Sequence, residues 1–142
     1  MTPEVRAVLG AVLALGVLQV AILLRLYATR IPALKAARIR PQNIDTAALA
    51  TLPPSARLAA ANYNNLFEAP TLFFALCAVA VLSGRADLID AVTAWTYVAL
   101  RTLHSLLHVT INIILWRFFL FCLSWLALAV LIANGARHLL LG

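Results

Sequence analysis

The sequence predicts an all-α membrane protein built as a bundle of four transmembrane helices. Three observations support this: 64% of the 142 residues are hydrophobic, only 11% are charged, and four apolar stretches are each long enough to cross a bilayer core of about 30 Å. A soluble domain of this size could not bury so much apolar surface. The expected spans are about residues 5–27, 57–82, 89–115 and 118–140, with a cytoplasmic loop at about residues 30–56, all in a single domain.

The basic residues are distributed unevenly, which predicts the orientation of the chain. The net charge is +6, and Arg117 lies at the third connection. Six of the eleven Lys and Arg residues lie in or beside the first connection: Arg25, Arg30, Lys35, Arg38, Arg40 and Arg57. By the positive-inside rule, the first and third connections are cytoplasmic, and both termini are periplasmic in a bacterial inner membrane. Because orientation explains most of the basic excess, we expect no nucleic-acid partner.

The first span is predicted to begin with Pro3 in its first turn, a position that tolerates proline. Its apolar run is interrupted by Gln19, which we expect to bond a neighbouring helix. Arg25 and Arg30 mark the cytoplasmic end, where they either extend their charges to the interface or bind an anion. The following connection is rich in proline and basic residues, which indicates a structured loop with a short interfacial helix at Ala33–Ile39.

The second span carries polar residues along one face. Ser55 is the expected cap of this helix. Relative to Arg57, the side chains of Asn64, Asn65 and Glu68 lie within about 80° on a helical wheel. An acid and two amides in an otherwise apolar helix need a polar partner elsewhere in the bundle.

Pro70 interrupts the hydrogen bonding of the second span. Because proline has no N–H, the carbonyl of Leu66 loses its helical donor, and we expect a kink there. The remainder of the span is apolar. Its Cys77, like Cys122 in the fourth span, is expected to be a small packing residue, and no metal-ligand spacing involves either one.

The third span combines an apolar composition with one polar stripe. An arginine near the centre of a bilayer costs roughly 2.5–3.5 kcal/mol by insertion scales, so this stripe must face other helices or water. Asp87 or Asp90 is favourable at the start of the helix, and Leu115–Arg117 is expected to form the turn into the fourth span. Spacings of four, three, four and four place the following residues on a single helical face: Tyr97, Arg101, His104, His108 and Asn112.

The polar faces of the second and third spans are expected to meet in the cytoplasmic half of the bundle. Glu68 can pair with Arg101 if the arginine side chain extends toward the cytoplasm. Two interpretations remain open from the residues alone. The polar groups form either a satisfied network that holds helices together or a functional site, because ionisable groups within a membrane are so often functional.

The motifs in these two spans resemble those of the MAPEG family, the membrane-associated proteins of eicosanoid and glutathione metabolism. The resemblance rests on Asn65-Leu66-Phe67-Glu68 followed closely by Pro70, on Arg101-x-x-His104 in the third span, and on Arg117 nine residues after His108. It covers nearly the whole chain, and the run Asn62–Ala75 looks most like bacterial members. The resemblance implies a homotrimer with glutathione bound between neighbouring subunits near the cytoplasmic face.

The resemblance also implies roles for individual residues. Asn65 and Glu68 match positions that hold the backbone and amino group of glutathione, and His104 matches a contact from the third helix. Arg117 matches the arginine proposed to stabilise the thiolate, a sensible role because a cation lowers the pKa of a thiol. Either Arg25 or Arg30 matches a first-helix arginine that meets a carboxylate. The chain departs from the eicosanoid enzymes at three positions: Asn64 replaces an arginine, His108 a tyrosine and Phe118 a serine.

The expected function is therefore that of a glutathione-dependent transferase or peroxidase. A thiolate held by Arg117 would attack a lipophilic electrophile or hydroperoxide that arrives from the bilayer, with Arg30, Asn64, Asn65, Glu68, Arg101, His104 and His108 as the candidate binding residues. One alternative within the same fold is a non-enzymatic lipid-binding membrane protein. Another is a structural bundle, or one in which His104, His108 and Glu68 exchange protons.

Overall fold

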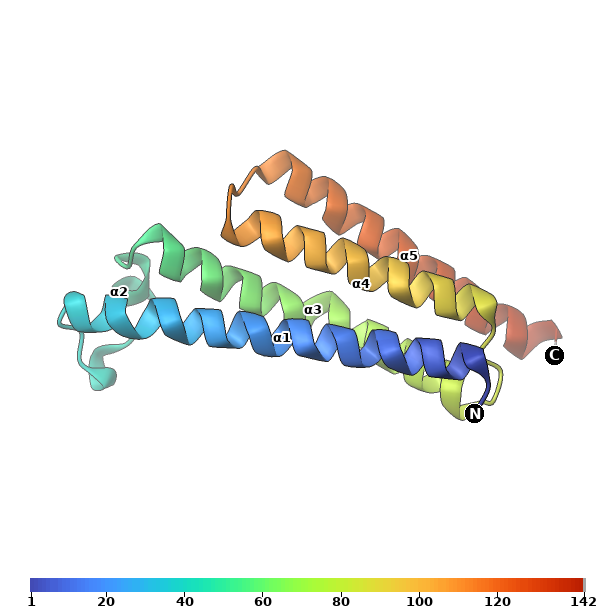
Figure 1. The fold of residues 1–142 in the computed structure, drawn as a ribbon. Coiled ribbons are helices and arrows are strands. Elements are labelled where there is room, and N and C mark those ends of the chain that lie inside the picture. The colour runs from blue at the N-terminus through green and yellow to red at the C-terminus, as the bar shows by residue number, and fades with distance from the viewer. Residues whose placement is uncertain (142) are drawn as a thin grey trace.

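The computed structural model describes residues 1–141, which are almost entirely helical (Figure 1). The long helices are α1 (Pro3–Ala36), α3 (Pro54–Leu82), α4 (Leu88–Val109) and α5 (Ile114–Leu141). The connection after α1 contains the 3₁₀ helix η1 (Pro41–Asn43) and the short helix α2 (Thr46–Ala50). The prediction of an all-α helical bundle is confirmed.

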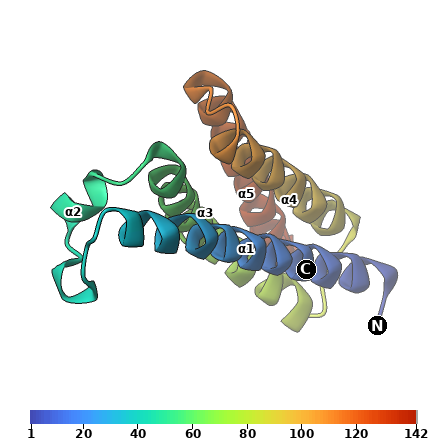
Figure 2. The same cartoon turned by 60° about the vertical axis from the view of Figure 1, so that its left-hand side comes forward.

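The long helices form two packed pairs that contact each other mainly through α4, with a smaller contact between α3 and α5. Helix α1 lies along α3, α4 lies along α5, and α4 also contacts α1 and α3. Figures 1 and 2 show that the α4–α5 pair lies close to α1 and α3 near the N-terminus and diverges from them toward the other end. Polar groups on α4 therefore face the other helices of the bundle.

Three of the long helices are apolar and long enough to cross a membrane in the described part of the chain. They are α1, α3 and α5. Helix α4 is not among them, because one face of it is polar and includes the buried Asp90 and Arg101. It lies against the three apolar helices. The integral membrane character is thus clear, whereas a fourth span through the bilayer stays a prediction.

The apolar core lies in the half of the bundle that contains the N-terminus. Leu15 of α1, Phe73 of α3 and Leu128 of α5 are fully buried there. The Phe73 ring stacks on the Tyr97 ring of α4, with 4.6 Å between centroids. Aromatic contacts and close packing are what hold helices together in lipid, where the apolar surroundings provide little hydrophobic driving force.

Helix α1 is longer than the predicted first span. It continues to Ala36, so Arg30 and Lys35 lie on the helix, and the expected interfacial helix at Ala33–Ile39 is wrong because its first four residues belong to α1. The helix ends where Arg38 adopts a left-handed conformation with φ of 56°, and the Ile39 N–H donates to the Leu34 carbonyl at 3.1 Å. This is the usual way in which a left-handed residue closes a helix.

The start of α3 also differs from the expectation. Pro53, in an extended conformation, precedes the helix, and Pro54 is its first residue, so Ser55 is not the cap. Proline at the first position of a helix loses no hydrogen bond, because the first N–H groups have no helical acceptor. The predicted cap at the start of α4 is confirmed: Asp87 and Asp90 form a reciprocal capping box.

The turn between α4 and α5 lies earlier in the chain than predicted. Helix α4 ends at Val109, and α5 begins at Ile114, so Leu115–Arg117 lies in the first turn of α5. Asn112 makes the turn in a left-handed conformation with φ of 47°, and its N–H donates to the Leu107 carbonyl at 2.8 Å. Asparagine tolerates this conformation better than most residues. The expectation that Asn112 continues the α4 stripe is therefore wrong.

Candidate functional site

The predicted polar stripe of α4 faces the interior of the protein. Tyr97, Arg101, His104 and His108 are all buried, and Arg101 is 0% exposed. Ser105, one residue after His104, is also buried and donates its hydroxyl to Asn62 Oδ1 at 3.1 Å. The helical spacing thus correctly predicted the direction of these four side chains.

Two backbone carbonyls of α3, next to Pro70, accept hydrogen bonds from other helices. Gln19 Nε2 of α1 donates to the Leu66 carbonyl at 2.7 Å, which confirms that Gln19 bonds a neighbouring helix. The guanidinium of Arg101 donates to the carbonyl of Asn65. The Leu66 carbonyl is available to such a donor because Pro70, four residues later, has no N–H to offer it.

Arg101 does not pair with Glu68. The guanidinium carbon lies 6.0 Å from the centre of the Phe121 ring, while Glu68 is exposed on α3. Within residues 1–141, no ion pair or hydrogen bond joins Glu68 to Arg101, His104 or His108. A helical wheel gives the direction of a side chain but not the neighbour that it meets, and here Glu68 is exposed on α3 rather than paired with α4.

Asn65, His104 and Arg117 line a hollow of about 230 Å³ between α3, α4 and the start of α5. Its other walls are Ile114, Phe118 and Phe121. Ring atom Nδ1 of His104 lies 3.0 Å from the Arg117 carbonyl oxygen, and the Arg117 guanidinium donates to Asn112 Oδ1. The polar groups of the hollow are therefore held by contacts between the end of α4 and the beginning of α5.

Several buried polar atoms in and behind the hollow have no hydrogen-bond partner within residues 1–141. A buried donor or acceptor left unpaired costs about 1–3 kcal/mol, and such atoms in a native protein normally meet water or a ligand. Arg117 Nε and His104 Nε2 lie at the hollow itself. The full set on α3, α4 and α5 is Asn62 Nδ2, Tyr97 Oη, Arg101 Nε and Nη1, His104 Nε2, His108 Nδ1 and Arg117 Nε.

The other predicted binding residues lie outside this hollow. Arg101 and His108 are buried in the bundle, with the His108 ring 5.8 Å from the His104 ring between centroids. Asn64 and Glu68 are exposed on α3, and Arg30 is half-buried in the last two turns of α1. The structure thus brings three of the eight predicted residues together in one hollow.

Sequence reasoning named two further polar residues, Asn112 and Arg25, but did not predict the contacts that they make beside the site. Asn112 holds the Arg117 side chain, and Arg25 of α1 donates to the Val109 carbonyl, the last residue of α4, at 2.8 Å. Asparagine is the residue type best suited to a left-handed turn after glycine, but the spacing of the polar stripe led to the prediction that Asn112 continues the helix. The partner of Arg25 depends on how α1 and α4 pack, which no local pattern reports.

The family assignment follows from the sequence comparison. A family model for the MAPEG family matches residues 8–137. The chain belongs to the MAPEG family. No curated protein and no solved structure shows a significant match to it. The MAPEG family comprises membrane proteins with glutathione-related transferase and peroxidase functions, and the hollow with Asn65, His104 and Arg117 contains three of the residues on which the resemblance rests.

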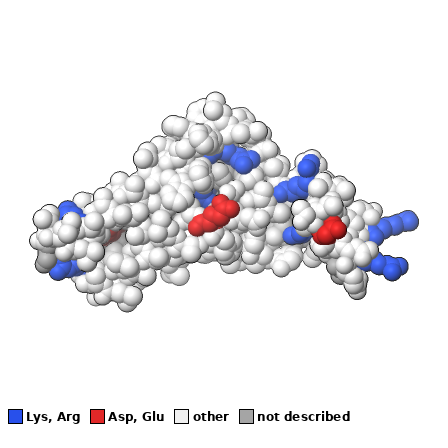
Figure 3. All heavy atoms as spheres, turned by 180° about the vertical axis from the view of Figure 1, so that it is seen from behind, with Lys and Arg blue, Asp and Glu red and all other residues white. Residues whose placement is uncertain are grey.

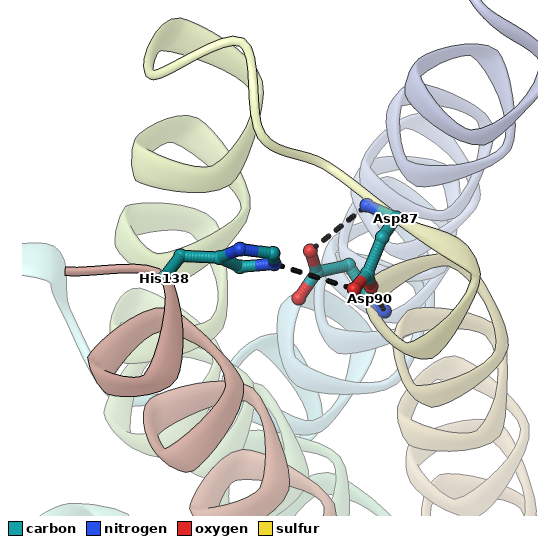
Figure 4. Close-up of side chains that lie close together, drawn as sticks. All are labelled: Asp87, Asp90 and His138. Atoms are coloured by element: carbon teal, nitrogen blue, oxygen red, sulfur yellow. Dashed lines mark hydrogen bonds and ion pairs between the residues drawn. The ribbon is translucent and has the colours of Figure 1, made fainter. Parts of the chain in front are cut away.

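The opposite end of this MAPEG chain carries a second polar cluster, which we call the Asp87 clasp: Asp87, Asp90, Asn134, Arg137 and His138. Figure 4 shows His138 of α5 directed at the two aspartates at the start of α4. A ring nitrogen of His138 and one carboxylate oxygen from each aspartate all lie within 4.8 Å of one another. Asp87 Oδ2 accepts from Arg137 Nη2 at 2.6 Å and lies 3.3 Å from His138 Nε2. Asn134 Nδ2 donates to both aspartates, at 3.1 and 2.9 Å.

The carboxylate oxygens of the Asp87 clasp already accept hydrogen bonds from protein donors, including the backbone N–H groups of the capping box. Burial alone would raise the pKa of Asp87. The hydrogen bonds from the Asp90 backbone, Asn134 and His138 outweigh it, so the pKa lies below its usual value. The clasp is therefore best described as a tie between the start of α4 and the end of α5.

Proposed function

We propose that this MAPEG protein is a glutathione-dependent transferase or peroxidase that acts on lipophilic electrophiles. The observation that carries the proposal is the hollow in which Asn65, His104 and Arg117 converge, with buried polar atoms of the latter two left without a protein partner. Glutathione has two carboxylates, amide groups and a thiol. The hollow and its surroundings supply the matching cation, amide and imidazole groups.

In this proposal Arg117 stabilises the thiolate. A nearby cation lowers the pKa of a thiol and increases the fraction of its nucleophilic form. One end of the Arg117 guanidinium is held by Asn112, which fixes the side chain, while Nε is buried and has no hydrogen-bond partner within residues 1–141. Donors that are held in place before the reaction stabilise developing charge without reorganisation.

A second copy of the chain is proposed to complete the site. The hollow of about 230 Å³ is smaller than the roughly 300–1,000 Å³ of most small-molecule sites. Glu68 and Asn64 are exposed on α3, and an exposed carboxylate on a membrane helix needs a polar partner. We propose a homotrimer in which Asn64, Glu68 and Arg30 contact the ligand at the subunit boundary, while Arg101 and His108 support it from within the bundle.

The lipophilic substrate is proposed to enter from the bilayer along the start of α5. An apolar groove of about 610 Å³ lies there, lined by Leu115, Trp116, Phe118, Phe119 and Cys122. It shares Phe118 with the polar hollow. A substrate in this groove would place its electrophilic carbon next to the thiolate, so that a sulfur–carbon bond forms as the leaving group departs with its electron pair.

Calorimetry and a conjugation assay together test the proposal. Purified protein should bind glutathione and conjugate it to a chlorodinitrobenzene-type probe. Glu68→Gln should weaken glutathione binding without changing the protein's free energy of unfolding, because Glu68 is exposed on α3. Arg6→Gln, at the opposite end of α1, is the matched control. Absence of both binding and conjugation by the wild type would refute the proposal.

A lipid-binding protein without thiol chemistry is the second candidate, and one observation favours it. A groove of about 810 Å³ on α1 and α3 is almost wholly apolar, with Val17, Val20 and Phe67 among its walls. This candidate predicts that a specific lipid copurifies with the protein and that glutathione has no effect on its stability. Mass spectrometry of the purified sample distinguishes it from the enzyme.

A further inference from the structure

We propose that the end of α1 and the loop after it form a binding surface for anionic lipid headgroups. We call this surface the basic arm and define it by five residues: Arg30, Lys35, Arg38, Arg40 and Arg57. All but Arg30, which is half-buried, are exposed. The space-filling view in Figure 3 shows basic side chains gathered at this end of the molecule.

The charge of the basic arm is nearly uncompensated. Between residues 30 and 57 the chain has these five basic residues and a single acidic one, Asp45. The carboxylate of Asp45 is turned toward the start of α2, where Oδ1 accepts from the Ala48 N–H at 2.7 Å. A surface of this charge attracts an anionic bilayer surface, because each basic residue near such a surface binds favourably to it.

The length of α1 places the basic arm at the membrane surface. A helix of 34 residues is about 51 Å long, whereas the hydrocarbon core is about 30 Å thick and the layer with headgroups about 40–45 Å. The apolar part of α1 ends at Leu24, so Arg30 lies at headgroup level. By the helical rise, Lys35 lies about 8 Å beyond Arg30, roughly one screening length at physiological salt, and Arg38 lies about 12 Å beyond it.

The basic arm is held in one conformation rather than left as an open loop. The left-handed Arg38 closes α1, and Leu52, in the loop just before α3, is 4% exposed. Two large apolar side chains flank the charges: Ile31 is 46% exposed and Ile44 is 40% exposed. Apolar side chains beside basic ones can insert between headgroups while the charges meet the phosphates.

The experiment uses the full chain, purified in detergent and exchanged into bicelles of phosphatidylcholine with increasing phosphatidylglycerol. Native mass spectrometry counts the phosphatidylglycerol molecules that each protein retains. The neutral variant is Lys35→Gln/Arg38→Asn/Arg40→Gln, with asparagine at position 38 because it tolerates the left-handed conformation. The charge-preserving control is Lys35→Arg/Arg38→Lys/Arg40→Lys, and Arg6→Gln tests a basic residue at the other end.

The wild type should retain phosphatidylglycerol in preference to phosphatidylcholine, and added salt should reduce this preference. The neutral variant should lose about five-fold in affinity for each charge removed, whereas the charge-preserving variant and Arg6→Gln should behave as the wild type. Equal retention by the neutral variant overturns the proposal. Binding of inorganic phosphate that displaces the lipid at millimolar concentration also overturns it, because the surface would then recognise a free anion.

Discussion

The carbonyl oxygen of Leu66 accepts a hydrogen bond from Gln19 Nε2 at 2.7 Å, four residues before a proline that has no N–H to offer it. The side chain of one membrane helix thus replaces a backbone donor that another helix lacks. In lipid there is no water to take that place. This contact between α1 and α3 lies beside one between α3 and α4, because the adjacent carbonyl, that of Asn65, accepts from Arg101.

Gln19→Leu should therefore destabilise the protein by about 1–2 kcal/mol, the range for polar contacts between membrane helices. In a Pro70→Ala background the cost should be smaller, because the alanine N–H can donate to Leu66 within α3. The free energy of unfolding in detergent micelles measures both. An equal cost in the two backgrounds would show that Gln19 does not act through the proline.

Arg117→Ala should reduce turnover more than glutathione binding. If the guanidinium stabilises the thiolate, its contribution is larger in the transition state than in the bound state, and kcat should fall about 100-fold, as it does when a donor to a developing negative charge is removed. Steady-state kinetics and calorimetry give the two quantities. Arg117→Lys should recover part of kcat, and equal losses in kcat and affinity would indicate an anion anchor instead.

Asn112 should act as a positioning residue for Arg117. Asn112→Gly keeps the left-handed turn but removes the amide that holds the guanidinium, so stability should persist while kcat falls and glutathione affinity changes little. Asn112→Ala should in addition cost about 1–2 kcal/mol of stability, because alanine resists this conformation. If Asn112→Gly has the wild-type kcat, Asn112 does not position Arg117 for the reaction.

The Asp87 clasp should make stability depend on pH. The pKa of Asp87 is lowered in the folded state, so the unfolded chain takes up the proton first. The stabilisation from Asp87 is fully present above about pH 5, where the carboxylate is ionised in both the folded and the unfolded chain. It is lost as the pH falls through the lowered pKa of Asp87 in the folded protein. Denaturant unfolding between pH 3 and 6 measures this loss of stability. Asp87→Asn should make stability less dependent on pH in this range, whereas Glu4→Gln should leave the pH dependence as in the wild type.

The sequence predicted best what depends on periodicity along one helix. The burial of Tyr97, Arg101, His104 and His108 follows from their spacing, because a helix places them on one face and lipid excludes that face. The sequence also predicted that Gln19 bonds a neighbouring helix and that the Leu66 carbonyl lacks a donor within α3, but it did not pair the two.

What the sequence could not predict depends on contacts between helices or on single backbone angles. The direction of Glu68 relative to α4 depends on how far α3 is rotated, which no wheel specifies. The early end of α4 depends on a left-handed Asn112 within an apolar run, Val109–Leu115, that contains neither glycine nor proline. The extra length of α1 depends on Arg38, which ends the helix in a left-handed conformation that glycine usually adopts.

The polar face of α4 also affects how the chain enters the membrane during synthesis. Alone, this helix would expose a buried arginine and two histidines to hydrocarbon, whereas α1, α3 and α5 are each long and apolar enough to cross a membrane. We expect α4 to remain at the insertion machinery until α5 has emerged, so that the pair integrates as a hairpin joined by Asp87 and Arg137. Chains that stop at Val109 should then leave α4 accessible to a water-soluble thiol reagent at an introduced cysteine, and chains that include α5 should protect it.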